Sequence, residues 1–352
     1  MTIPTEPIGS IPRPAYLIEA LGEHAAGRLD ADGVGESREK ALVDTVSRLE
    51  ETGSPVLTDG EQGKPSFATY PLAGLTSLAP DGVVIPFADG HTRQLPRLTG
   101  GPFRYQTYAD SYLREVKKHT AKPVKQAVIA ASAISLVYPG EELAGYDKEQ
   151  FIADLVNEAE ADIRRSLDAG ADSVQIDFTE GRLSLKLDPS GGLLQSFVDL
   201  NNAVLDRFSE EERKKIGVHT CPGGDQDSAH SLDVDYAGLL PTLFQLKVGN
   251  VYVQLASETE PGRALQVIAE HSRPEQRIFV GVTDPIDPRV ETAEEVRDRV
   301  LQAARYISPD RLGTCDDCGF SPFADDTSTS RDTAFAKITA RVEGTRLAAR
   351  SL

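Results

Sequence analysis

Long apolar runs and positive charge are both scarce in this 352-residue sequence. No eighteen consecutive residues are apolar, and residues 1–7 have neither a basic region nor an apolar core, so we expect neither export nor membrane insertion. The formal net charge is −18, which argues against binding to nucleic acid or to an anionic membrane surface. The three cysteines fit a reducing compartment, so we expect a cytoplasmic protein.

A glycine-rich turn of the G-x-G-x-x-G kind is also missing, which argues against an open dinucleotide-binding sheet. From residue 124 onward, apolar runs of strand character alternate instead with amphipathic helical stretches. Strands are predicted at 124–131, 173–177, 216–220, 250–255, 277–283 and 311–314. Helices are predicted at 147–169, 193–208, 239–246, 263–271, 292–307 and 331–349. This alternation predicts an α/β fold in which helices wrap a parallel sheet.

Polar residues at the C-terminal ends of several strands favour a closed (β/α)8 barrel over an open sheet, because barrels draw their chemistry from many strand ends. These residues are Asp59, Asp177, His219, Gln254, Asp284 and Asp317.

The first 120 residues are less regular. We predict a helix at 37–52, a first barrel strand at 54–60, and a β-hairpin at 82–98 with its turn at 88–91. No linker or internal repeat divides the chain. We therefore expect one catalytic barrel domain over 1–352, with an N-terminal loop and helices at 1–53 and the hairpin within an insertion at 79–106.

A possible metal site follows from three residues at two strand ends. His219 and Cys221 form a His-x-Cys pair, whose side chains point to one side of an extended backbone, and Cys318 follows a distant strand. One nitrogen and two sulfurs suit zinc, and three protein ligands leave a position open for catalysis. Two alternatives stay open: the cysteines are simply buried apolar residues, or Cys221 and Cys318 form a disulfide, which the reducing compartment disfavours.

Prolines lock residues 8–14 into a fixed loop. This loop either presents Ser10 and Arg13 to a small polar ligand or serves only as a rigid lead-in over the barrel's edge. Asp225 and His230 follow the proposed metal motif, but their loop reads more simply as a helix cap. Cys315 has Asp neighbours that disfavour a redox role, and His91 reads as a surface residue.

Several motifs, in the same order along nearly the whole chain, resemble the catalytic half of cobalamin-independent methionine synthases and their shorter zinc-dependent relatives, such as the epoxyalkane:coenzyme M transferases. The pair His-x-Cys and Asp-Cys-Gly is fairly specific, whereas Ile-Gly-Ser alone is weak. The motifs are Ile8-Gly-Ser10, Asp59-Gly-Glu61, Gln175-Ile-Asp177, His219-x-Cys221, Gly281-Val-x-Asp284 and Asp317-Cys-Gly319.

The resemblance implies a barrel in which zinc, held by His219, Cys221 and Cys318, binds the sulfur of a thiol substrate. It assigns Ser10 and Glu61 to the amino acid part of homocysteine and Asp177 to substrate binding. A free thiol is mostly protonated at neutral pH, so coordination to zinc would supply the nucleophile.

The departures from the family concern the metal and the alkyl donor. Gln254 stands where methionine synthases have a glutamate ligand, and Glu258 is an alternative ligand one turn later. The chain has no Trp to stack a pterin, the corresponding region being 135–138, and Ile286 replaces a histidine proton donor. Asp284 or Asp287 would replace that acid only with a raised pKa. An epoxide, or a donor with an easier leaving group than folate, fits these losses better.

The sequence thus predicts a zinc-dependent enzyme that transfers a methyl group to homocysteine from a small alkyl donor. Thiol addition to an epoxide, with coenzyme M as the thiol, is the alternative. A more distant one is a metal-free lyase resembling uroporphyrinogen decarboxylase. Asp177 and Asp284 are the candidate catalytic residues, and Ser10, Arg13, Glu61, Asp177 and Gln254 the candidate substrate-binding residues. The oligomeric state stays open.

Overall fold

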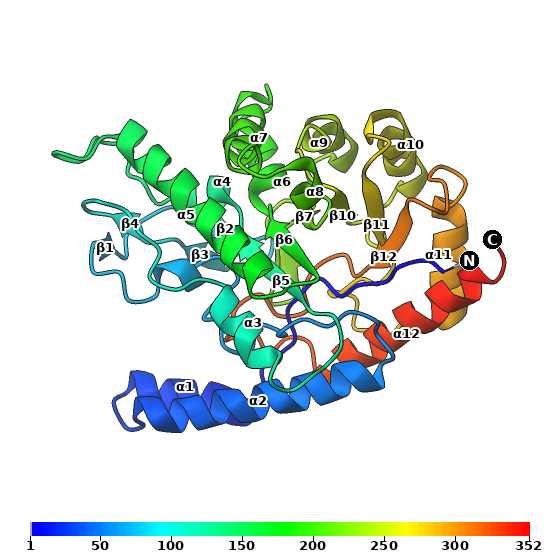
Figure 1. Ribbon diagram of the computed structural model, residues 1–352, viewed down its shortest axis with the longest axis horizontal. Coiled ribbons are helices and arrows are strands. Elements are labelled where there is room, and N and C mark those ends of the chain that lie inside the picture. The colour runs from blue at the N-terminus through cyan, green and yellow to red at the C-terminus, as the bar shows by residue number, and fades with distance from the viewer. Residues whose placement is uncertain (1) are drawn as a thin grey trace.

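The computed structural model describes residues 2–352 and contains a six-stranded parallel sheet (Figure 1). Its strands follow the order β12-β11-β10-β7-β6-β5, and each neighbouring pair is parallel. All six are buried except for the first residue of β10 and of β11, as expected for strands covered on both faces. The strands are β5 (Lys125–Ile129), β6 (Ser173–Asp177), β7 (Ile216–Thr220), β10 (Asn250–Val253), β11 (Arg277–Gly281) and β12 (Leu312–Cys315).

Two extended segments complete the ring at the edges of this sheet. Thr5 bridges Thr314 of β12, and Leu57 bridges Val124 just before β5, both in the parallel sense. The two segments then meet each other, because the Ile11 N–H donates to Gly60 O at 3.1 Å. The six strands and the two bridged segments together make the eight parallel elements of a barrel, so the (β/α)8 prediction is confirmed. The strand predicted at 54–60 is reduced to a single bridge.

Helices surround the strands of the barrel (Figure 1). The six predicted from residue 147 onward are all present. Their observed bounds are α5 (Lys148–Asp168), α7 (Gly192–Leu205), α9 (Tyr236–Leu243), α10 (Pro261–His271), α11 (Ala293–Ala303) and α12 (Arg331–Ala349). Capping boxes fix two starts: Asp147 with Gln150 opens α5, and Thr292 with Glu295 opens α11. None of the helices among residues 2–352 is long and apolar enough to cross a membrane.

Five further helices were not predicted, and four of them have eight residues or fewer, a length at which helical periodicity is a weak signal. They are α1 (Ala15–Ala25), α3 (Asp110–Val116), α4 (Ala131–Ser135), α6 (Glu180–Leu187) and α8 (Glu210–Arg213). The helix predicted at 37–52 is longer than expected and forms α2 (Ala31–Glu51), which begins at the Asp30 cap. α1 and α2 lie side by side in Figure 1.

The predicted hairpin at 82–98 is present as two short antiparallel ladders. β2 (Val84–Pro86) pairs with β3 (Thr92–Gln94), and β1 (Leu78–Ala79) pairs with β4 (Arg97–Leu98). Gly90 takes a φ of +95° in the turn, where a side chain would be strained. The division into one domain over 1–352 with an insertion at 79–106 stays a prediction.

A small apolar cluster joins the N-terminal segment to strands β10, β11 and β12. It contains Ile8, Tyr252, Phe279 and Cys315, with the Tyr252 and Phe279 rings stacked at 4.6 Å. Burial holds the pKa of the Cys315 thiol well above its usual value, so this residue is part of the packing and unsuited to thiolate chemistry.

Candidate active site

The three predicted metal ligands meet at the C-terminal ends of the strands. His219 lies on β7, Cys221 directly follows that strand, and Cys318 lies three residues after β12. Their ligand atoms all lie within 4.8 Å of one another. The two Sγ atoms are 3.2 Å apart and both cysteines are free, so the disulfide alternative is not realised.

The His219 ring is oriented by the next strand of the barrel. Its Nδ1 lies 3.2 Å from Oδ1 of Asp177 at the end of β6, and Gln175 Nε2 donates to the same oxygen at 2.7 Å. Burial alone would lower the pKa of His219, but the bond to Asp177 and the charge of Cys318 raise it above its usual value. A histidine that binds a metal through one ring nitrogen usually has its other ring nitrogen hydrogen-bonded to a carboxylate, as His219 has with Asp177. The donor set of one nitrogen and two sulfurs therefore fits a zinc ion.

A cavity of about 70 Å³ opens beside this cluster. Polar residues of the barrel rim form part of its wall, and the hairpin segment adds Ile85, Phe87 and Arg93. The lining residues are Ile8, Gly9, Ser10, Glu61, Phe67, Ile85, Phe87, Arg93, Asp177, Thr179, His219, Cys221, Gly223, Gly224, His230, Cys318, Gly319, Pro322 and Phe323.

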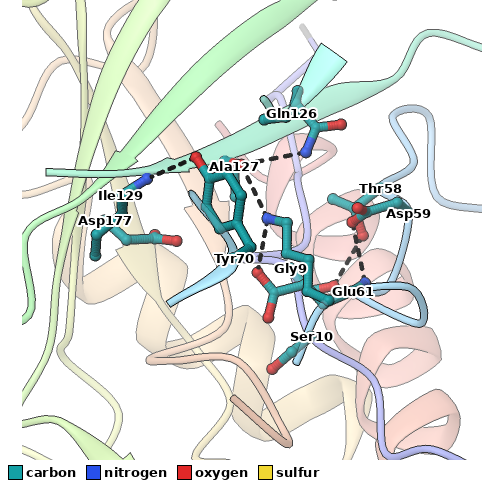
Figure 2. A network of polar contacts seen from close by, with 12 residues as sticks. Gly9, Ser10, Thr58, Asp59, Glu61, Tyr70, Gln126, Ala127, Ile129 and Asp177 are labelled. Carbon is teal, nitrogen blue, oxygen red and sulfur yellow. Dashed lines mark hydrogen bonds and ion pairs between the residues drawn. The ribbon is translucent and has the colours of Figure 1, made fainter. Parts of the chain in front are cut away.

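Glu61 directly follows the 54–60 segment and lines the cavity. Only 2% of this residue is exposed. Its Oε1 lies 3.3 Å from Lys64 Nζ, while its buried Oε2 has no hydrogen-bond partner among residues 2–352. Burial raises the pKa of Glu61 to about 7 despite the nearby Lys64 charge. Figure 2 shows Glu61 among Ser10, Asp59 and Asp177, and its backbone φ of +57° places it in a region that few residues adopt.

Lys64 was not predicted as part of the site. Its Nζ also donates to Ala127 O at 3.0 Å and lies 4.8 Å from the centre of the Tyr70 ring. Burial disfavours its charged form, but Glu61 and the nearby aspartates raise its pKa above the usual value, so it stays cationic. The only local signal was its position three residues after Glu61.

Ser10 reaches the cavity because the N-terminal segment crosses the Asp-Cys-Gly motif. Its Oγ accepts the Ser321 N–H at 3.0 Å, and a Cβ on Gly319 would lie 2.3 Å from that oxygen. The glycine of the motif is therefore required by the close approach of Ser10. Asp317 accepts from the backbone of Leu255 and Ala256 at 2.8 and 2.9 Å, which anchors the residue before Cys318.

Three predicted site residues, Arg13, Asp284 and Gln254, do not line the cavity. Arg13 donates to the backbone oxygens of Glu61, at 2.7 Å, and of Lys64, at 3.2 Å, so it supports the loop that carries Glu61. Asp284, whose pKa is raised by burial, accepts the Ile286 N–H at 3.0 Å.

Gln254 and its alternative Glu258 are both held by another residue. Arg182 Nη1 lies 3.1 Å from Gln254 Oε1 and 2.9 Å from Glu258 Oε1. Glu258 does not belong to the cluster that His219 forms with the cysteines, which fits a site with three protein ligands.

The loop after Cys221 differs from the predicted helix cap. Asp225 belongs to a small ladder of β8 (Gly224–Asp225) and β9 (Ser228–Ala229), and it binds two hairpin residues. Arg93 Nε lies 2.5 Å from its Oδ2 and His91 Nε2 lies 3.1 Å from the same atom. His91 also stacks on Phe87 at 4.3 Å, so its interpretation as a surface residue was wrong.

The aromatic residue of the region that corresponds to the family's pterin-stacking tryptophan, Tyr138, is part of the core. Tyr138 packs on Phe151 at 5.1 Å between ring centres, and its hydroxyl donates to Tyr146 O at 3.0 Å. Ile286 lies against Gly224, where a Cβ would be 3.9 Å from its Cδ1 and 4.0 Å from Cys318 Sγ. An apolar side chain therefore occupies the position where the resemblance would have implied a proton donor.

Comparisons with known proteins identify the family of the chain. The family described as the catalytic domain of cobalamin-independent synthases matches residues 3–339. The methionine synthase of Saccharolobus solfataricus is 23% identical over 346 residues, which cover 98% of this chain and 94% of that protein. The methionine synthase of Thermococcus kodakarensis is 23% identical over 350 residues, which cover 99% and 94%.

Solved structures show the same fold. A B12-independent methionine synthase from a Shewanella species, in complex with selenomethionine, has a TM-score of 0.77 at 18% identity and covers 100% of this chain and 99% of its own. A putative vitamin-B12 independent methionine synthase from Listeria monocytogenes has a TM-score of 0.75 at 19% identity and covers 98% of both chains.

Proposed function

Because the chain belongs to the family of cobalamin-independent synthase catalytic domains, we propose that it is a methionine synthase-type transferase. It would move a methyl group, or another small alkyl group, to the sulfur of homocysteine. The observation that carries this proposal is the cluster of one nitrogen and two sulfurs beside a buried carboxylate with a free oxygen.

His219, Cys221 and Cys318 would hold a zinc ion, since their donor atoms match its preference and Asp177 already orients the histidine. When bound, zinc would lower the pKa of the substrate thiol and present its sulfur as a thiolate. Asp177 is thus a positioning residue for the ligand set as well as part of the cavity wall.

The charges of the cavity favour an amino acid thiol. Glu61 Oε2 can accept the ammonium group of homocysteine, and the Ser10 hydroxyl, which has no acceptor among residues 2–352, can donate to its carboxylate. Arg93 is the only Lys or Arg on the described wall, and two carboxylates, Asp225 and Asp325, already bind it.

Coenzyme M fits this cavity poorly, because it brings a sulfonate and no ammonium group to a wall that carries Glu61 and Asp177. A metal-free lyase would leave the nitrogen and sulfur cluster without a role. Methyl transfer from folate is disfavoured because Tyr138 lies in the core and Ile286 cannot donate a proton. The cytoplasmic location stays a prediction.

The first test is metal content. Purified wild-type protein is expected to contain about one zinc per chain by mass spectrometry of the metal, and Cys221→Ser and Cys318→Ser are expected to lose it. Cys315→Ser is the matched control, because Cys315 packs against Ile8, Tyr252 and Phe279 away from the cluster. Retention of zinc in both ligand variants would contradict the proposed site.

The second test is thiol consumption. The zinc-loaded protein is incubated with homocysteine or coenzyme M against methyl-folate, methylcobalamin and small epoxides. We expect homocysteine to be consumed and coenzyme M to react much more slowly. Faster consumption of coenzyme M would replace the proposed substrate by the alternative one.

A further inference from the structure

One buried histidine of the cavity wall is not used by the proposed binding of homocysteine. His230 follows β9 and is 7% exposed. Its backbone N–H donates to Gly223 O at 3.1 Å, and the Ser231 N–H donates to Pro222 O at 3.1 Å, so the loop folds back onto the residues after Cys221. A Cβ on Gly223 would lie 1.7 Å from His230 Nε2 and 2.2 Å from its Cδ2, so the imidazole packs directly against this glycine, and both residues line the cavity.

The hydrogen bonds of His230 indicate which nitrogen carries the proton. Nδ1 lies 2.6 Å from Ser231 Oγ, and Ser231 is fully buried. If Nδ1–H donated to Oγ, the buried Ser231 hydroxyl hydrogen would have no acceptor among residues 2–352, which costs free energy. If the hydroxyl donates to Nδ1, both groups are satisfied and Nε2 carries the hydrogen. Burial, with Lys186 and Arg182 nearby, lowers the pKa of His230 to about 4, so the ring is neutral at physiological pH.

Aromatic and aliphatic side chains line the cavity together with His230. Phe87 meets the His230 ring edge-on at 5.5 Å, and the hairpin also supplies Ile85. Phe67 and Phe323 line the same cavity and pack edge-to-face at 5.8 Å. Arg93, which lies over the Phe323 ring at 4.1 Å, is neutralised by its two carboxylates, so the region offers no free cation to an anionic ligand.

We propose that this apolar region is the subsite for the alkyl donor, and that His230 Nε2–H donates a hydrogen bond to the donor's leaving atom. The donor is therefore an uncharged, compact molecule whose leaving atom is an oxygen or nitrogen with a lone pair. This inference rests on the proposed function, since it needs the thiol to be held beside Cys221 and Cys318.

The atoms balance without a further reactant. The thiol proton leaves to water, the sulfur forms a bond to the alkyl carbon, and the bond from that carbon to the leaving atom breaks. The leaving atom keeps the electron pair, is stabilised by the His230 hydrogen bond, and finally takes a proton from water. The sum is a thiol plus an alkyl donor giving a thioether plus the protonated leaving group.

Two probes separate the role of His230 from the rest of the reaction. Opening of 1,2-epoxypropane places negative charge on an oxygen, whereas methyl iodide releases iodide, which needs no hydrogen bond. We expect His230→Phe to lower the ratio of the epoxide rate to the methyl iodide rate roughly 100-fold, the usual scale of assistance to a leaving group. His230→Gln keeps an N–H donor and should recover part of the ratio. His271→Gln, on the exposed end of α10, is the control and should leave both rates unchanged.

The tautomer gives a readout that does not depend on turnover. Nitrogen-15 NMR of histidine-labelled protein, with the His230 signals assigned by their loss in His230→Gln, should show a protonated Nε2 and an unprotonated Nδ1. A protonated Nδ1, or a rate ratio that is the same in His230→Phe as in the wild type, would overturn the inference. If neither probe alkylates homocysteine in the wild type, the proposed function itself fails, and the inference fails with it.

Discussion

At the scale of single residues, Glu61 brings a buried carboxylate to the cavity wall. One of its oxygens faces Lys64 and the other has no hydrogen-bond partner among the described residues, so the carboxylate has room for one more cation. Its pKa of about 7 means that this capacity itself depends on pH near neutrality. Below pH 7 the neutral acid cannot pair with an ammonium group, and above pH 7 the carboxylate can.

We therefore predict that the KM for homocysteine falls as the pH rises from 6 to 8, with a midpoint near 7. Glu61→Gln should raise this KM about 10- to 100-fold at pH 8, which is the scale of one charge-assisted hydrogen bond, and should abolish the midpoint. Initial rates against homocysteine concentration measure both effects.

The control for this prediction is 4-mercaptobutyrate, which is homocysteine without its amino group. Its KM should be similar in the wild type and in Glu61→Gln, because it has no ammonium group to lose. An equal rise for both thiols would assign Glu61 a structural role instead.

Part of the cavity wall could be predicted from the sequence. Asp177, His219 and Cys221 are placed by strand alternation and by the common rim of parallel strands, both of which are local rules. Arg13 could not be placed, because backbone oxygens of distant loops attract its guanidinium. His230 was missed for a similar reason, since only the fold of its loop brings it back to Gly223.

At the scale of elements, the β2–β3 hairpin joins the two loops that follow the candidate metal ligands. Arg93 binds Asp225, in the loop after Cys221, and Asp325, in the loop after Cys318. The Asp225 side chain is fully buried, whereas that of Asp325 is largely exposed. The hairpin thus holds both loops at fixed positions while it covers the cavity.

We predict that Arg93→Met lowers the free energy of unfolding by roughly 3 kcal/mol, because it leaves the buried Asp225 carboxylate with only His91. Arg97→Met is the matched control on the same hairpin. Its ion pair with Asp81 is exposed, so its loss should cost less than about 1 kcal/mol. Chemical denaturation measures the free energy of unfolding of both variants. Equal losses would show that Arg93 does not hold the two loops together.

The boundaries of the hairpin followed from its turn chemistry, but its position did not. Asp89 and Gly90 predict a tight turn, which is observed. The ion pairs that attach the hairpin to the barrel reach residues more than a hundred positions away. Sequence pattern alone does not contain these pairings.

At the scale of the whole molecule, stability should depend on pH through a buried acid away from the cavity. Glu180 of α6 contacts Ser132 of α4, whose hydroxyl also accepts from Asn201 of α7 at 2.7 Å. Burial raises the pKa of Glu180 to about 8 from its usual value near 4.5, and no cation among residues 2–352 forms an ion pair with it. Between these two values the folded protein holds a proton that the unfolded chain releases, so Glu180 disfavours folding increasingly as the pH rises.

We predict that Glu180→Gln stabilises the protein, since the amide can still accept from Ser132 without a charge. The gain in melting temperature should be smallest near pH 5, grow up to about pH 8, and then level off. Thermal unfolding of both proteins from pH 5 to 9 measures the difference. A gain that is constant with pH would contradict the assigned titration.

The barrel itself was largely predictable, because from residue 124 onward the six strands of the sheet and a helix after each of them were all expected from the sequence pattern. Of the two closing segments, 54–60 was predicted as a barrel strand and makes a single bridge, whereas the N-terminal segment was predicted as a loop. The position of each segment depends on the other segment and on one edge of the sheet. A pattern within a short stretch of sequence does not contain this information.

The bridge between Thr5 and Thr314 joins residues that lie more than 300 positions apart. A contact of such long sequence separation requires a large loop to close, so it forms slowly compared with the pairing of neighbouring strands. Until this bridge forms, the outer edge of β12 is unpaired, and an unpaired strand edge is a site at which partly folded chains aggregate. The N-terminal segment therefore protects the last strand of the sheet as well as shaping the cavity.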